Sequence, residues 1–425
     1  MKTLIKQGYL LDPASNKEGK YDLLIEDSVI SKVDSVICEE VDQVIEADGL
    51  YVMPGFIDLH VHLREPGFEY KETIETGARA AAAGGYTTIC PMPNTNPVID
   101  SKEMVEELKK KATLDSKVNI IPVGAVSKGQ SGLELADIAG MVRAGAGAIS
   151  EDGKSVMDIL LYVEGMKQAK AANIPVFAHC EDKDLVRSGV MNAGERAKEL
   201  GLPGITNAVE DVICARDIFL AQETGVRLHL CHCSTKASVS LVKMAKEIGL
   251  PVTGEVCPHH FTMSDDEIDK DHSKYKMNPP LRSVNDVQAL KEGLRDGIMD
   301  VIATDHAPHS EVEKNGSMIG SPFGIVGLET AFALTMTELV KPKYLSPMQM
   351  VEKMSLNPAK VLGIPKGSLS VGSIADITIA DPKIEYTIDA SSFLSKGKNT
   401  PFDGKKVVGQ IMYTIVNGIL VYKNK

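Results

Sequence analysis

The stretch GFIDLHVHLREPG, residues 55–67, places two histidines two positions apart on an apolar run. Its β-branched and large apolar residues follow Pro54 and Gly55, which predicts a short buried strand. Residues i and i+2 of a strand point to the same face, so His60 and His62 project together. Two imidazoles on one face at a strand end are typical of ligands to a single metal ion. The structural alternative is a pair of buried, hydrogen-bonded histidines.

Other apolar runs of the chain also end in side chains that can bind metal. These are His179 in IPVFAHC, His232 in VRLHLCHC, Asp152 in SEDG after AGAIS, and Asp305 in DVIATDH. Imidazole and carboxylate without thiolate suit Zn²⁺, and also Mn²⁺ or Co²⁺. Four histidines and two carboxylates exceed one tetrahedral ion and suit two. Two ions that share a carboxylate and a hydroxide would polarise a carbonyl and supply a nucleophile near neutral pH.

The elements that must position these groups alternate between apolar runs and helical patterns such as SKEMVEELKKKA. Counting GFIDLHVH, about eight strand–helix units follow one another, which predicts an α/β fold built on a (β/α)8 TIM-type barrel. We place this metal-dependent barrel at residues 55–367. Active-site groups of such barrels lie at the carboxyl ends of the strands, where all six candidate ligands fall.

Both ends of the chain are rich in short strand patterns. Residues 1–54 and 368–425 each contain such pieces, and neither segment has enough apolar residues for a core of its own. VNGIL near the end is a strong hairpin signal. We therefore expect one small β-sandwich domain formed by both termini.

Composition restricts the class of protein. The chain is 43% hydrophobic and 24% charged, which is typical of a globular protein, and its net charge of −12 argues against nucleic acid as a partner. We find no signal peptide and no apolar run long enough to span a membrane, and we expect a cytoplasmic protein. Seven cysteines, an odd number, argue against a disulfide framework. Strand alternation predicts that Cys231 and Cys233 point away from His232 as core residues.

Several motifs are similar, in order and spacing, to those of the amidohydrolase superfamily and, within it, of the class I dihydroorotases. They are DLHVHLREPG, MPNTNP, SEDG, AHCED, CHCST, MNPPLR and TDHAPH, and the resemblance covers essentially the whole chain. It implies two Zn²⁺ ions per subunit, a small cyclic amide as substrate and a homodimer. In the implied ligand set, one ion is held by His60, His62 and Asp305, the other by His179 and His232, and Asp152 bridges the two.

The same resemblance implies a substrate and its binding residues. The enzyme would be a hydrolase of cyclic amide C–N bonds that reversibly converts N-carbamoyl-L-aspartate to (S)-dihydroorotate and water in de novo pyrimidine (UMP) biosynthesis. A metal-bridging hydroxide would attack, and Asp305 would be the general acid/base. The substrate would be bound by His62, Arg64, Asn94, Asn278, His309, Phe323 and Gly324. Association with other enzymes of the pathway would involve separate chains.

The residues themselves support these roles to different degrees. Arg64 lies beside two ligands, which favours an anion clamp because a planar guanidinium binds a carboxylate through two hydrogen bonds. Asn94 and Asn278 lie in turn sequences and could be turn residues. Many superfamily members bridge their metals with a carboxylated lysine. Lys154 is the candidate here, but its position past the strand end predicts that it faces solvent.

Alternatives remain at this stage. The chain could be another cyclic amidohydrolase, allantoinase or dihydropyrimidinase, or an inactive barrel that serves as a scaffold. Residues 310–320, SEVEKNGSMIG, are polar and glycine-containing, which predicts a mobile loop over the site. The sequence leaves open the role of His259 and His260 in CPHH, because that motif also ends a strand.

Overall fold

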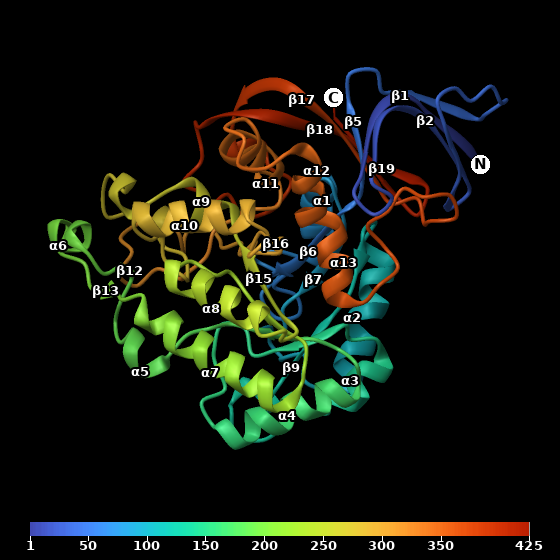
Figure 1. The fold of residues 1–425 in the computed structure, drawn as a ribbon. Coiled ribbons are helices and arrows are strands. Elements are labelled where there is room, and N and C mark those ends of the chain that lie inside the picture. The colour runs from blue at the N-terminus through green and yellow to red at the C-terminus, as the bar shows by residue number, and fades with distance from the viewer. Residues whose placement is uncertain (425) are drawn as a thin grey trace.

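In the computed structural model, which describes residues 1–424, the middle of the chain forms a ring of parallel strands surrounded by helices (Figure 1). One sheet of three strands contains β6 (Phe56–Val61), β7 (Tyr86–Pro91) and β8 (Asn119–Ile120). A second sheet contains six strands: β9 (Val123–Ala125), β10 (Ala148–Ser150), β11 (Val176–Ala178), β14 (Leu228–Leu230), β15 (Val252–Val256) and β16 (Val301–Ile302). A parallel bridge between Val61 and His306 joins the last strand region to the first. The predicted barrel is confirmed.

The helices of the barrel follow its strands in turn, as the alternating pattern predicts. They are α1 (Ile74–Ala83), α2 (Lys102–Asp115), α3 (Ile138–Ala144), α4 (Ile159–Ala171), α7 (Ala208–Thr224), α8 (Lys236–Glu247) and α10 (Val284–Arg295). Shorter helices occupy the connections: α5 (Lys183–Val186), α6 (Glu195–Leu200) and α9 (Pro258–Thr262). After β16 come α11 (Ala331–Thr335), α12 (Pro347–Val351) and α13 (Asn357–Leu362). Two short strands, β12 (Met191–Asn192) and β13 (Gly204–Ile205), pair with each other outside the barrel.

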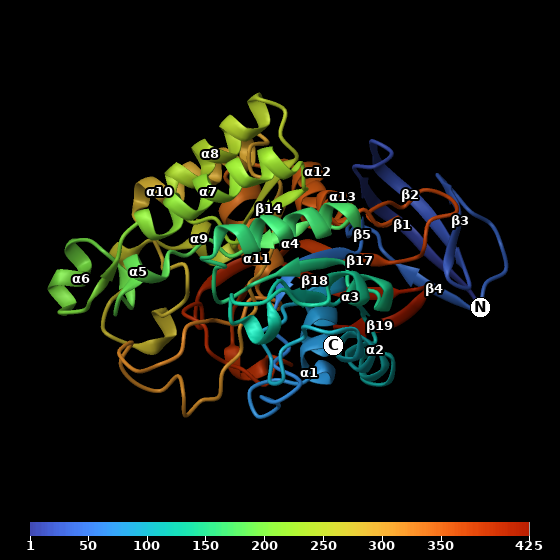
Figure 2. The ribbon, with the colours of Figure 1, turned by 90° about the horizontal axis from the view of Figure 1, so that it is seen from below.

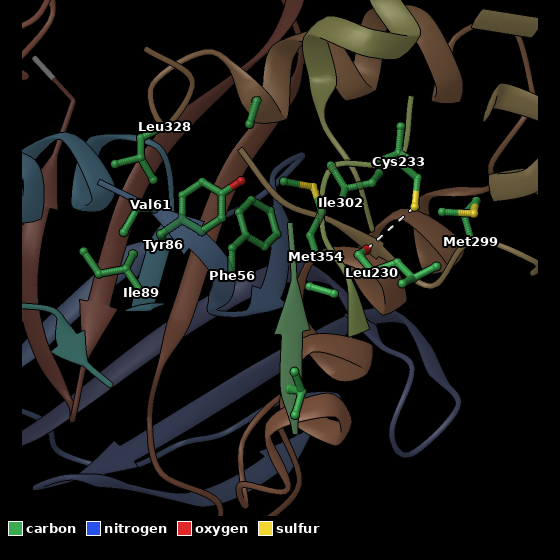
Figure 3. Packing of buried hydrophobic residues seen from close by; sticks show 14 of the residues in the cluster. Phe56, Val61, Tyr86, Ile89, Leu230, Cys233, Met299, Ile302, Leu328 and Met354 are labelled. Atoms are coloured by element: carbon green, nitrogen blue, oxygen red, sulfur yellow. Dashed lines mark hydrogen bonds between the residues drawn. The ribbon is translucent and has the colours of Figure 1, made fainter. Parts of the chain in front are cut away.

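Local sequence explains where these elements begin and pack. The Thr73 side chain accepts a hydrogen bond from the Thr76 amide and so caps α1, which relieves one of the unpaired donors of a helix start. The residues of β6 and β7 are buried throughout, as strands covered by helices on one side and barrel core on the other must be. Figure 3 shows Phe56 of β6 beside Tyr86 of β7, whose ring centroids lie 5.8 Å apart. Such packing fixes the register of neighbouring strands.

Strands from both ends of the chain form one continuous sheet at the side of the barrel (Figures 1 and 2). The N-terminal segment supplies β1 (Lys2–Asp12), β2 (Lys17–Glu26), β3 (Val29–Asp34), β4 (Gln43–Glu46) and β5 (Tyr51–Pro54). The C-terminal segment supplies β17 (Ile377–Thr387), β18 (Lys406–Val416) and β19 (Ile419–Lys423). The two groups meet where β5 pairs with β17. The prediction that both termini form one β domain is confirmed, but its strands belong to one connected sheet rather than to the two separate sheets of the predicted β-sandwich.

The VNGIL hairpin connects β18 to β19 as predicted. Asn417 and Gly418 both have positive φ, 50° and 78°, which is the backbone that a tight two-residue hairpin turn requires. A Cβ on Gly418 would lie 1.8 Å from the carbonyl oxygen of Asp27, so only glycine fits there. Within residues 1–424, no helix has the length and apolar character to cross a membrane.

Candidate metal centre

The six predicted ligands all lie at or just beyond the carboxyl ends of barrel strands. His60 is in β6 and His62 follows it, while His179 directly follows β11. Asp152 comes two residues after β10, His232 two after β14 and Asp305 three after β16. All six side chains are buried. Residues separated by up to 245 positions thus meet at one end of the barrel.

Asp152 lies at the centre of this cluster. Its Oδ1 is 3.1 Å from His60 Nε2, 3.4 Å from His179 Nδ1 and 3.8 Å from His232 Nε2. Its Oδ2 is 3.5 Å from His62 Nε2. One carboxylate therefore faces all four imidazoles, which is the arrangement expected of a ligand shared by two ions.

Asp305 closes the other side of the cluster. Its Oδ1 lies 3.1 Å from His62 Nε2 and 3.6 Å from His60 Nε2. His60, His62 and Asp305 form one group whose ligand atoms lie within 4.8 Å of one another, and His60, Asp152 and His232 form a second. The two groups share His60.

The donor set fits metal ions. His60 Nε2, Asp152 Oδ1 and His179 Nε2 are buried without a hydrogen-bond partner, which is costly unless something else satisfies them. His179 Nδ1 and His232 Nε2 lie 2.8 Å apart with both rings buried. Imidazole nitrogens and carboxylate oxygens crowded together in this way are consistent with a metal site.

The same crowding controls the charge of the carboxylates. Burial alone would raise the pKa of Asp152, but the imidazoles of His60, His179 and His232 outweigh burial and hold that pKa well below its usual value. The pKa of Asp305 is lowered in the same way, because His62 and His60 overcome the effect of burial. Both carboxylates are therefore ionised at neutral pH and available as ligands.

The segment after β10 presents only one carboxylate to the cluster. The Glu151 side chain turns away and accepts hydrogen bonds from Ser127 and from the backbone amides of Val126 and Ser127. Lys154 is exposed, and its Nζ donates to the carbonyl oxygen of Gln130 at 3.0 Å. The structure thus leaves Asp152 as the residue of this segment that reaches the histidines.

Three of the predicted substrate-binding residues form a second group beside the cluster. Arg64 donates from Nε to the carbonyl oxygen of Pro308 at 3.1 Å, and its NH2 lies 3.2 Å from His309 Nε2. The same His309 nitrogen lies 2.7 Å from the carbonyl oxygen of Phe323. Burial lowers the pKa of Arg64 to about 10, which still leaves the guanidinium charged at neutral pH. Gly324 follows with φ of 130°, and a Cβ there would lie 2.6 Å from that of Ala307.

The two asparagines occupy different positions. Asn94 lies between ligands, since its Oδ1 is 3.0 Å from His62 Nδ1 and its Nδ2 donates to Asp152 Oδ2 at 3.1 Å. Asn278 instead donates to the carboxylate of Glu181. Glu181 Oε2 lies 3.8 Å from His179 Nε2. Sequence reasoning missed Glu181, although its place two residues after His179 was a signal.

The prediction that Cys231 and Cys233 are buried core residues is confirmed, but the prediction that both point to the same face was wrong. β14 ends at Leu230, and His232 has φ of 33°, so strand alternation does not extend to Cys231 and Cys233. Cys231 lies inside the barrel, where its thiol groups with His60 and Glu255. Cys233 packs instead in the large hydrophobic core that includes residues of the surrounding helices. Its Sγ lies 3.8 Å from the carbonyl oxygen of Leu230, and Figure 3 shows this contact.

The structure also shows where His259, His260 and the 310–320 segment lie. His259 and His260 are both buried at the start of α9, and His260 Nε2 lies 2.9 Å from the carbonyl oxygen of Pro279. The 310–320 segment contains neither helix nor strand, as predicted. It is tethered, because Lys314 Nζ donates to the carbonyl oxygens of Lys276 and Pro322, each at 2.9 Å. Whether this segment moves over the site stays a prediction.

A parallel barrel with histidines and aspartates at its strand ends, and a sheet made from both termini, defines the amidohydrolase superfamily. Solved structures of this class match the chain throughout. The L-hydantoinase (dihydropyrimidinase) of Arthrobacter aurescens matches with a TM-score of 0.89 at 27% identity, covering 99% of this chain and 96% of that chain. The D-hydantoinase (dihydropyrimidinase) of Thermus sp. matches with a TM-score of 0.84 at 27% identity, covering 99% and 95%.

Sequence comparison narrows the class. Residues 49–238 match the family described as Dihydro-orotase-like. The dihydroorotase of Acetivibrio thermocellus is 48% identical over 99% of this chain and 99% of its own. That of Bacillus licheniformis is 48% identical over 100% of this chain and 99% of its own. The chain belongs to the dihydroorotase family.

Proposed function

We propose that the protein is a dihydroorotase, which reversibly cyclises N-carbamoyl-L-aspartate to (S)-dihydroorotate and water in pyrimidine biosynthesis. Full-length identity of 48% to dihydroorotases supports the activity. The observation that carries the chemistry is Asp152, whose two oxygens lie within 3.8 Å of four buried imidazoles. This arrangement supports a centre in which one carboxylate is shared.

The proposed centre holds two Zn²⁺ ions per subunit. His60, His62 and Asp305 would hold one ion and His179 with His232 the other, while Asp152 would bridge them. When bound, such ions polarise a carbonyl oxygen and lower the pKa of water, which makes amide attack possible near neutral pH. Asn94 supports the arrangement because it hydrogen-bonds both His62 and Asp152 and so fixes their orientation.

Asp305 is the proposed general acid/base. In ring opening, its carboxylate would take a proton from the attacking water and pass it to the departing ring nitrogen. In ring closure the same oxygen would hold the proton that leaves with water. The lowered pKa of Asp305, caused by His62 and His60 against the effect of burial, supports a carboxylate that begins ring opening ionised.

Substrate recognition is assigned to the group beside the centre. Arg64 and His309 would bind the substrate carboxylate together with Asn94, and backbone atoms around Phe323 and Gly324 would bind the ring amide. Asn278 would contact the substrate from the side of Glu181. His62 would contact substrate as well as metal. The positions of these residues support the assignment. An Arg64 guanidinium nitrogen lies 3.2 Å from His309 Nε2, and the same His309 nitrogen contacts the carbonyl oxygen of Phe323.

The second candidate is a hydantoinase- or dihydropyrimidinase-type cyclic amidohydrolase, or allantoinase. The likeness to solved hydantoinases favours the hydantoinase type, at 27% identity. A buried guanidinium beside the centre argues for dihydroorotase, because dihydropyrimidines lack the carboxylate that it would bind.

A direct assay separates these candidates. Purified protein is incubated with dihydroorotate, dihydrouracil, hydantoin and allantoin in parallel, and the metal content of the same sample is measured. The proposal expects turnover of dihydroorotate to exceed that of the other rings by orders of magnitude, with about two equivalents of zinc. Comparable turnover of dihydrouracil would contradict it.

The cellular setting is also proposed. We place the enzyme in the cytoplasm as a homodimer, with contacts to other pyrimidine-pathway enzymes made between chains. Seven free cysteines support a reducing compartment. Exposed apolar side chains on neighbouring helices, Leu160 of α4 and Phe219 of α7, support self-association. Light scattering of the purified protein tests the dimer.

A further inference from the structure

One buried carboxylate, Glu255, lies behind the metal centre and contacts predicted ligands of both ions. It belongs to β15 and is fully buried inside the barrel. Its Oε1 accepts hydrogen bonds from His60 Nδ1 and from the backbone amide of His232, each at 3.0 Å. Its Oε2 lies 3.0 Å from His229 Nε2. None of the sequence motifs pointed to this residue.

The contact with His60 determines how that ring can bind metal. A neutral imidazole that donates from Nδ1 to a carboxylate presents a lone pair at Nε2. That Nε2 is 3.1 Å from Asp152 Oδ1 and 3.6 Å from Asp305 Oδ1, and it has no hydrogen-bond partner of its own. Glu255 therefore selects the tautomer in which His60 is a ligand.

The contact with His232 acts on the backbone. His232 has φ of 33°, a left-handed conformation that residues other than glycine rarely adopt and that persists only where the surroundings hold it. Glu255 accepts the amide hydrogen of this residue. In the resulting position, the His232 ring faces the cluster, with Nε2 2.8 Å from His179 Nδ1.

The far side of Glu255 is closed by a hydrogen-bonded chain. His229 Nδ1 lies 2.8 Å from Thr253 Oγ1, so each nitrogen of that buried ring has a partner. A carboxylate with three donors on its two oxygens has little freedom to rotate. It can therefore transmit a fixed orientation to the residues on the side of the metal centre.

We propose that Glu255 is a positioning residue shared by both halves of the metal centre, fixing the His60 ring through its side chain and the His232 ring through its backbone. The proposal rests on the proposed metal centre. It predicts that loss of Glu255 weakens both ions together, although Glu255 is not one of the six predicted ligands. A residue that supported His60 alone would affect one ion only.

The test measures metal binding rather than turnover. Zinc affinity of wild type, E255L and E255Q is determined by competition with a chelator, and the visible absorption of each Co²⁺-substituted protein is recorded. E255L removes every acceptor, so both ions should bind at least about 10-fold more weakly and the Co²⁺ bands should change. E255Q keeps an acceptor for His60 and His232 but loses the charge, so its loss should be smaller, at least about threefold for each ion.

Asp217 provides matched controls. It is a buried carboxylate on α7 that accepts a hydrogen bond from Arg216 and lies 3.3 Å from the Tyr162 hydroxyl, and neither of these partners is a predicted ligand. D217L and D217N should keep wild-type zinc affinity and Co²⁺ bands. An equal loss in D217L would show that any buried carboxylate matters and would overturn the proposal.

Other outcomes also decide. Wild-type affinity in E255L overturns the shared role, and so does the loss of one ion alone. A third equivalent of zinc that disappears in both E255L and Cys231→Ser would make Glu255 a ligand and overturn it as well. If E255L does not fold, E255Q decides alone: wild-type affinity for either ion is then the contradicting result. If wild type binds no metal, the proposed centre itself fails.

Discussion

Asp152 is the ligand that the two ions of the proposed centre would share. His60, His179 and His232 approach one of its oxygens and His62 the other. A lysine can act as such a bridge only after reaction with carbon dioxide, whereas an aspartate needs no modification. The chemical difference between the two bridges gives a direct test.

Asp152→Ala should lose both ions and at least about 10³-fold in turnover, because a methyl group supplies no bridging oxygen. In wild type, metal-stripped enzyme should recover with zinc alone, without added bicarbonate. Metal content and dihydroorotate turnover measure both results. Lys154→Ala is the matched control and should behave as wild type. A strict bicarbonate requirement would reopen Lys154 as the bridge.

Arg64 is expected to bind substrate without taking part in bond making. Arg64→Ala should raise KM for dihydroorotate by about 10- to 100-fold, the effect of one lost charge-assisted pair, and lower kcat less, since the carboxylate is held alike in ground and transition states. Arg64→Lys keeps the charge but not the paired donors, so its KM should lie between those of wild type and Arg64→Ala. Steady-state kinetics decides, and an unchanged KM in Arg64→Ala would speak for a dihydropyrimidinase-type function.

The sequence predicted the candidate ligands because strand ends of a parallel barrel converge, so any histidine or aspartate there becomes a candidate. It did not predict Glu255 or Glu181. Glu255 contacts His60 and His232, which are distant in sequence, and Glu181 contacts His179 around a turn. Their positions in the sequence do not distinguish them from other acidic residues near strand ends. Cys231 was misplaced because the positive φ of His232 ends the alternation on which the prediction rested.

At the scale of elements, strand and helix order followed from hydrophobic periodicity, and the β18–β19 hairpin from Asn417 and Gly418. Connections were harder to predict. The sequence of segment 310–320 predicts a polar loop without tertiary contacts. In the structure, the ammonium group of Lys314 donates hydrogen bonds to two backbone carbonyl oxygens, those of Lys276 and Pro322, and these bonds hold the segment in place. A lysine that uses its charge on carbonyl oxygens cannot be told from a solvated one by sequence.

Glu329 ties the start of α11 to a distant segment and should make stability depend on pH. Its carboxylate accepts hydrogen bonds from the backbone amides of Leu394 and Ser395, at 2.8–3.0 Å. Burial, with some repulsion from Glu72, raises its pKa from 4.5 to about 7. Between these two values the folded state keeps a proton that the unfolded state releases. The free energy of unfolding from this group therefore falls as pH rises, by at most about 1.4 kcal/mol per pH unit, and levels off above pH 7.

Glu329→Gln removes that titration. Relative to wild type, the variant should become progressively more stable between pH 5 and pH 8, as measured by urea unfolding at both values. Glu46→Gln, at an exposed position of β4, is the control and should show no such trend. A Glu329→Gln difference that stays constant from pH 5 to pH 8 would contradict the assignment.

At the scale of the whole molecule, the barrel carries the candidate ligands and the terminal sheet packs against its side. The candidate ligands lie at or just beyond the carboxyl ends of barrel strands, while the sheet packs its C-terminal half against α1 and α11. We propose domain boundaries at 54/55 and 367/368, with the two terminal parts acting as one unit. The ligands span residues 60–305, so bound ions would join β6, β10, β11, β14 and β16 at one end of the barrel.

Removing metal should therefore lower the stability of the barrel as a whole. Ions that bind only the folded state stabilise it by RT ln(1 + [L]/Kd), about 2.7 kcal/mol per site at a free concentration 100 times Kd. Chelator-treated protein should melt several degrees lower than the zinc-loaded form, and added zinc should restore the melting temperature in a concentration-dependent way. Asp152→Ala should melt at the same temperature with and without zinc, because it has lost the shared ligand. Glu46→Gln should keep the full zinc-dependent shift. If stripped and loaded wild type melt together, the six side chains do not hold ions that join the strands, and the barrel must be stable through its apolar core alone.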